Sequence, residues 1–170
     1  MPHIDHFTIG NDIALPELYA LSKGSLCDLS RIVAIDLATP APSPAVTRAD
    51  GATMLRQDLL HLLEHGNLAL NCYAIYTRLG GESWRLRYVG ETTIQRAAAD
   101  LAFCLLPNVT RQSSIHARCS AAVQAGCLIG LRLIHVEPDT LRHFIQEKML
   151  MEMQSGETLD WHVGAHGKSR

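Results

Sequence analysis

The 170-residue sequence predicts an α+β fold, in which a small antiparallel or mixed β-sheet is flanked by helices. Residues 68–78 and 84–90 have strand-like composition, and the turn between them contains Gly80 and Gly81. This arrangement predicts a β-hairpin, because paired glycines supply the positive φ that tight turns need. Apolar residues make up 47% of the chain, which is enough to bury a core and excludes a wholly disordered protein.

The hairpin is expected to be followed by a helix, a second helix, a strand and a third helix. The expected ranges are 93–106, 112–125 and 131–136, with the last helix beginning at Pro138. Ser113 or Ser114 is the expected N-cap of the second helix, and Gly126 is expected to end it. The predicted sheet is therefore a hairpin plus a third strand.

Composition divides the chain into an N-terminal extension, residues 1–67, and a main domain, residues 68–170. Within the extension, the pattern predicts a short helix near 16–20, a strand over 31–37, a linker over about 39–52 and a helix over 54–64. The linker contains three prolines within five residues, which is typical of an extended surface segment.

Composition and charge exclude several classes of protein. The five cysteines include no CxxC pair, which argues against a disulfide scaffold or a zinc knuckle and favours free thiols in a reducing compartment. No apolar run approaches the length of a membrane span and no signal peptide is present, so a soluble, cytoplasmic protein is expected.

The net charge of −2 is not that of a protein that holds nucleic acid by bulk electrostatics. The charge is uneven, with four basic and eight acidic residues in 1–70 and eleven basic and nine acidic residues in 71–170. Twelve of the fifteen basic residues are arginine, whose planar guanidinium suits phosphate, although a GC-rich genome also favours arginine codons.

Two tripeptides mark the predicted hairpin. Ala74-Ile75-Tyr76 is followed, after eleven residues, by Tyr88-Val89-Gly90, and a later helix carries Glu147 in the segment EKML. In this order the features resemble the GIY-YIG endonuclease family over about residues 70–170, and most resemble its type II restriction enzymes. The resemblance implies a sheet of a hairpin and a third strand, flanked by helices, that supports metal-dependent phosphodiester hydrolysis.

The resemblance also implies a role for each site residue. Tyr76 would be the general base, Tyr88 would position the water or the phosphate, and Glu147 would bind Mg²⁺ or Mn²⁺. Both phenols are expected to project from one face of the hairpin, near one end. A phenol has a pKa near 10, so it becomes a usable base only when a cation favours phenolate. The catalytic arginine is either Arg96 or Arg118.

The chain departs from the family pattern at three places. Ala74 replaces the first glycine, Trp161-His162 stands where an aromatic-asparagine pair is expected, and the usual histidine or tyrosine after the arginine is absent. His116 is a candidate substitute for the last of these. Five residues are expected to contact DNA: Arg85, Arg87, His116, His162 and Lys168.

The resemblance therefore predicts a sequence-specific endonuclease that cleaves double-stranded DNA as a homodimer, with the N-terminal extension supplying base contacts or the dimer surface. One alternative is a nuclease of repair, recombination or antibacterial toxicity. The other is a non-catalytic interaction module, in which the tyrosines only pack and the arginines and Glu147 are ordinary surface residues.

Overall fold

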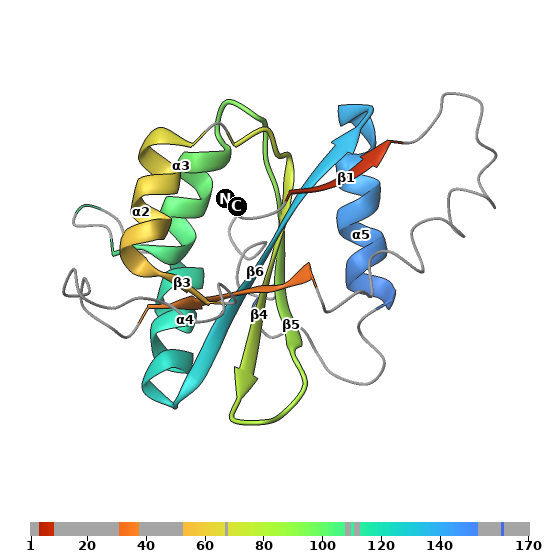
Figure 1. The fold of residues 1–170 in the computed structure, drawn as a ribbon. Helices are drawn as coiled ribbons and strands as arrows, with labels where there is room; N and C mark the ends of the chain where they lie inside the picture. Colours follow the sequence, from red (N-terminus) through yellow and green to blue (C-terminus); the bar gives the residue numbers. More distant parts are fainter. Residues whose placement is uncertain are drawn as a thin grey trace.

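A computed structural model describes residues 4–8, 31–37, 53–66, 68–107, 110, 113–152 and 161 (Figure 1). The strands are β1 (Ile4–Thr8), β2 (Val33–Asp36), β3 (Thr53–Leu55), β4 (Cys72–Leu79), β5 (Arg85–Glu91) and β6 (Cys127–Glu137). The helices are α2 (Arg56–His65), α3 (Ala97–Leu105), α4 (Ser114–Gln124) and α5 (Arg142–Glu152), with a 3₁₀ turn η2 (Asp139–Leu141) before α5. No helix in these residues combines the length and apolar composition needed to cross a membrane.

All six of these strands belong to one mixed sheet, in the order β3-β2-β6-β4-β5. The long strand β6 is its centre, because β4 pairs antiparallel along one edge while β1 and β2 share the other edge. β2 runs antiparallel beside residues 129–131 of β6, and β1 runs parallel beside residues 133–137. The predicted α+β class is confirmed, with a larger sheet than a hairpin and one further strand.

Helices cover both faces of the sheet (Figure 1). The face covered by α2, α3 and α4, called here the α3/α4 face, carries one apolar cluster, and the face covered by α5, called the α5 face, carries another. The first includes Leu59, Leu62, Ile75, Leu101, Ile115 and Leu131. The second includes Ala74, Tyr76, Leu86, Ile134, Ile145 and Met149.

From β4 onward the order of elements is the predicted one. The predicted cap of α4 is confirmed, since the Ser113 hydroxyl accepts hydrogen bonds from the backbone N–H groups of Ile115 and His116 at 3.2 and 3.4 Å. Gly126 ends this helix with φ of 87°, a conformation that glycine adopts without steric cost. β6 begins four residues before its predicted start, so it pairs with the whole length of β4.

Residues 1–67 contribute to the same sheet and the same core. β2 confirms the strand predicted over 31–37, but residues 53–55 pair with β2 as β3, so the helix predicted from residue 54 begins at Arg56. β1 was not predicted from its short, partly polar sequence. The helix expected near 16–20 and the linker over 39–52 lie outside the described residues.

Candidate functional site

A β-bulge in the hairpin decides which tyrosines face each other. Ile75 pairs with Tyr88 and Tyr76 pairs with Leu86, so Arg87 is an extra residue without an opposite partner. Strict alternation would place Tyr88 on the face of Leu86 and Tyr76, but the bulge turns it to the other face. Tyr76 is fully buried on the α5 face, whereas Tyr88 packs on the α3/α4 face. The expectation that Tyr76 and Tyr88 share a face is therefore wrong.

The neighbour of Tyr88 on its own face is Tyr73, three residues before Tyr76. The two ring centroids are 6.1 Å apart. Gly90 lies opposite Tyr73 across the hairpin, and a Cβ at position 90 would overlap the phenol ring of Tyr73. The glycine of the Tyr-Val-Gly tripeptide thus makes room for the tyrosine pair, Tyr73 and Tyr88.

The tyrosine pair lies in surroundings that keep both phenols neutral. The Tyr73 hydroxyl is 3.4 Å from the Sγ atom of Cys104. Burial is the main cause that raises the pKa of Tyr73 well above its ordinary value, followed by its neighbours Cys104 and Tyr88. Burial also raises the pKa of Tyr88. Without a bound cation, both side chains are hydrogen-bonding groups rather than bases.

Arg96 reaches the surroundings of the tyrosine pair through Asp100. Its guanidinium is 3.5 Å from the Asp100 carboxylate, and Asp100 also accepts a hydrogen bond from the Thr92 hydroxyl at 2.5 Å. The charge of Asp100 contributes to the raised pKa values of both tyrosines. The Arg96 side chain itself is 75% exposed, so most of its charge faces solvent.

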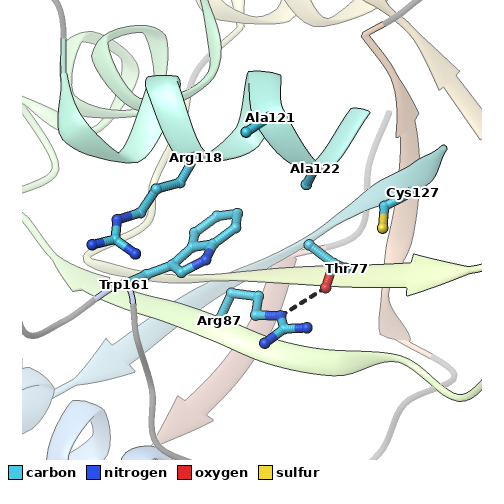
Figure 2. A pocket seen from close by; sticks show the side chains of 7 residues that line it. All are labelled: Thr77, Arg87, Arg118, Ala121, Ala122, Cys127 and Trp161. Carbon is cyan, nitrogen blue, oxygen red and sulfur yellow. Dashed lines mark hydrogen bonds between the residues drawn. The ribbon is translucent and has the colours of Figure 1, made fainter. Parts of the chain in front are cut away.

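A pocket of about 380 Å³ opens on the α3/α4 face between the hairpin and α4 (Figure 2). We call it the arginine pocket, because Arg87 from β5 and Arg118 from α4 both line it. The remaining lining residues are Thr77, Ala121, Ala122, Cys127 and Trp161. Arg87 donates a hydrogen bond from Nε to the Thr77 hydroxyl at 2.8 Å.

The arginine pocket is suited to an anion. No acidic side chain lines it among the described residues, and no hydrogen bond or ion pair joins Arg118 to another residue in that part of the chain. The planar guanidinium of arginine suits the oxygens of phosphate and carboxylate anions. Ile75 pairs with Tyr88, and Thr77 of the pocket comes two residues later in β4. Two residues of a strand span about 7 Å, which is the distance along the strand from Tyr88 to the start of the pocket.

Glu147 is not brought together with the tyrosine pair. Its helix α5 packs Ile145 and Met149 onto the α5 face, and the Glu147 side chain is 62% exposed. Its carboxylate lies 3.2 Å from Nε2 of His143, whose Nδ1 lies 3.5 Å from the carboxylate of Glu91.

The described residues do not fit a preformed metal centre. They contain no group of three or more histidine, cysteine, aspartate or glutamate side chains that could hold a metal ion. The carboxylate of Glu147, the expected ligand, lies beside the His143 imidazole.

Two other predicted DNA contacts, Arg85 and His116, do not line the arginine pocket. Arg85 is exposed and pairs with Glu82 at 3.7 Å. His116 lies on α4, and its buried Nδ1 has no hydrogen-bond partner among the described residues. His162 and Lys168 lie outside the described residues. Among the predicted contacts that the structure describes, Arg87 lines the same pocket as Arg118, a candidate catalytic residue.

No protein-family model, curated protein or solved structure matches this chain. Two features on one face of the sheet, the arginine pocket and the tyrosine pair, carry the functional proposal. Sequence reasoning missed Tyr73, which alternates with Ile75 along the strand, and it gave no role to Trp161, which stands where the family's aromatic-asparagine pair is expected.

Proposed function

We propose that the protein is a metal-dependent DNA endonuclease that hydrolyses phosphodiester bonds, with the arginine pocket binding the phosphate. One observation carries this proposal: Arg87, the residue before Tyr88 in β5, and Arg118 of α4 line one pocket. The order of elements from β4 to α5, two strands, two helices, a strand and a helix, also agrees with the resemblance.

The arginine pocket supplies what a scissile phosphate requires. Guanidinium groups donate two parallel hydrogen bonds to phosphate oxygens and neutralise the charge that develops in the transition state. Tyr88 lies next to Arg87 in the chain and, as a neutral phenol, can donate a hydrogen bond to a phosphate oxygen or a water. Tyr73, and not Tyr76, is the tyrosine beside Tyr88, and as a buried, neutral phenol it would position Tyr88 rather than act as the general base.

Mg²⁺ or Mn²⁺, which the resemblance implies, would activate water and neutralise phosphate charge when bound. Glu147, the expected ligand of that metal ion, lies on α5 beside His143 and not beside the tyrosine pair. We therefore assign no catalytic step to a metal ion. We propose that this nuclease is a homodimeric restriction enzyme that acts on double-stranded DNA. The alternative roles are repair, recombination and toxicity.

A plasmid-nicking assay with Mg²⁺, Mn²⁺ or a chelator tests this proposal. We expect Arg118→Ala to lower the nicking rate about 100-fold, because it removes a donor to the phosphate. Arg142→Ala is the matched control, since Arg142 lies on α5 and outside the pocket, and it should retain activity. Arg96→Ala tests the other candidate arginine, and Glu147→Gln tests the metal ligand.

Two outcomes would overturn the endonuclease proposal. One is a wild-type protein that nicks no DNA with either metal across varied substrates. The other is an Arg118→Ala variant that nicks as fast as wild type while unfolding at the same temperature.

The same assay separates the two tyrosine assignments by comparing Tyr73→Phe with Tyr76→Phe. Only Tyr73→Phe should lose activity.

A second candidate is a non-catalytic DNA-binding module on the same scaffold. It is favoured by one specific observation, the separation of Glu147 from two phenols whose pKa values burial raises. This candidate predicts DNA binding that depends on Arg118 but no cleavage with any divalent metal.

A further inference from the structure

The arginine pocket is divided into a polar part and an apolar part. Arg87, Thr77 and Arg118 supply hydrogen-bond donors and positive charge. The apolar lining consists of the Trp161 indole together with Ala121, Ala122 and Cys127 (Figure 2). A phosphate group alone would use only the polar part, so the lining indicates a ligand that also has a flat or apolar portion.

The size of the pocket agrees with such a ligand. Its volume of about 380 Å³ falls within the range of about 300–1,000 Å³ typical of small-molecule sites. The Nε atom of Arg87 is engaged with Thr77, which fixes the guanidinium and leaves its two terminal amino groups for a ligand. Arg118 has no competing partner in the described part of the chain.

We propose that the arginine pocket binds one unpaired nucleotide, with its phosphate on Arg87 and Arg118 and its base against Trp161 and the alanines of α4. A base inside a duplex is stacked on both faces and paired at its edge, so it cannot enter a pocket walled by side chains. An unpaired base offers its π-face to an aromatic side chain, an interaction that tolerates any sequence. The inference rests on the proposed function, and narrows its substrate to DNA with an unpaired or extruded nucleotide.

Tryptophan fluorescence tests this binding without any cleavage. The chain has two tryptophans, and Trp84 lies elsewhere, packed against the α5-face cluster with the Arg78 guanidinium 4.6 Å from its ring. Titration with deoxyadenosine monophosphate should change the emission of wild type and of Trp84→Phe equally. The change should be absent in Trp161→Phe, where the remaining tryptophan is far from the ligand.

Calorimetry with three probes then separates the two parts of the pocket. Deoxyadenosine monophosphate should bind at least tenfold more tightly than inorganic phosphate, which lacks the base, or deoxyadenosine, which lacks the phosphate. Arg118→Ala should weaken monophosphate binding at least tenfold, and Arg142→Ala, on α5 and outside the pocket, should leave it unchanged. Ala122→Leu, which fills the pocket, gives a second blocking variant in case Trp161→Phe does not fold.

The outcomes distinguish this inference from the proposed function. Equal affinity for inorganic phosphate and the monophosphate overturns the nucleotide pocket, while leaving the phosphate site of the nuclease intact. No binding of the monophosphate, together with Arg118-dependent nicking, also overturns the inference alone. Binding as expected, without any nicking, supports the pocket and removes the endonuclease proposal.

Discussion

Asn71 directly precedes β4, and its side chain forms hydrogen bonds with Val136 near the end of β6. It is fully buried, and its amide oxygen accepts a hydrogen bond from the backbone N–H of Val136 at 2.8 Å. Its amide nitrogen donates to the Val136 carbonyl and to the Asp139 carboxylate, each at 2.9 Å. One side chain therefore satisfies both backbone groups of Val136, which lies in the α5-face cluster.

Asn71→Ala should lower the free energy of unfolding by about 2 kcal/mol or more, because both buried backbone groups of Val136 lose a partner. Urea unfolding measures the change. Gln124→Ala, at an exposed position on α4, is the control and should stay within about 0.5 kcal/mol of wild type. An Asn71→Ala protein as stable as this control would show that water replaces the lost bonds.

Gly90 and Gly81 provide a matched pair for the packing of Tyr73. An added methyl group at Gly90 would overlap the Tyr73 ring, whereas nothing lies within 4 Å of the corresponding position at Gly81. Gly90→Ala should therefore destabilise the protein by about 1–3 kcal/mol, and Gly81→Ala should have little effect. Thermal unfolding compares the two, and equal midpoints would contradict the placement of Tyr73 over Gly90.

At the scale of elements, the sequence predicts what its local patterns encode. The sequence predicts the hairpin turn at its glycines, the N-cap at Ser113 and the helix end at Gly126. Each of these features depends only on residues close to it in the chain. The bulge at Arg87 was not readable, because Trp84, Leu86 and Tyr88 alternate with arginines as in a regular strand. One extra residue then reverses the face of Tyr88, and with it the assignment of the tyrosine pair.

The convergence of site residues was also beyond local patterns. Arg87 and Arg118 were each candidates from the sequence, but their meeting in one pocket depends on the packing of α4 against the sheet. Trp161 joins them from a segment whose sequence signals no element. The separation of Glu147 from the tyrosine pair likewise follows from the packing of α5 on the opposite face, which is the face of Tyr76.

Strand β1 is attached to β6 by a buried ion pair. Nε of Arg132 donates to Asp5 at 2.6 Å, and these side chains are only 2% and 10% exposed. Asp5→Ala should lower the free energy of unfolding by about 3–5 kcal/mol, because it leaves a buried guanidinium without this carboxylate. Arg31→Ala is the control: Arg31 lies 3.8 Å from Asp5 and is 48% exposed, so its loss should cost less than about 1 kcal/mol. Similar losses in the two variants, measured by urea unfolding, would contradict a buried pair.

The whole molecule should lose stability in alkaline solution. Burial raises the pKa values of Cys72 and Cys119 from 9.0 to about 12, and raises those of Tyr73, Tyr88 and Cys104 as well. The unfolded chain releases these protons from about pH 9 upward, while the folded chain retains them to higher pH. Their contribution to stability is thus fully present below pH 9 and is lost as pH rises toward 12.

The unfolding midpoint, measured from pH 7 to 11, should fall steadily above pH 9. Cys72→Ala removes one of these protons, so the midpoint of this variant should fall less steeply than that of wild type. A midpoint independent of pH in this range would show that the buried thiols and phenols ionise as readily in the folded state as in the unfolded state.

The fold as a whole depends on residues 1–67. β1 and β2 cover one edge of β6, and Leu59 and Leu62 of α2 complete the α3/α4-face cluster. A fragment of residues 68–170 would expose that strand edge and that apolar surface, and would separate Arg132 from Asp5. We expect this fragment to lack a cooperative unfolding transition by circular dichroism, while the full chain shows one. A fragment with a dispersed NMR spectrum and a cooperative transition would instead establish that residues 68–170 fold as a domain without residues 1–67.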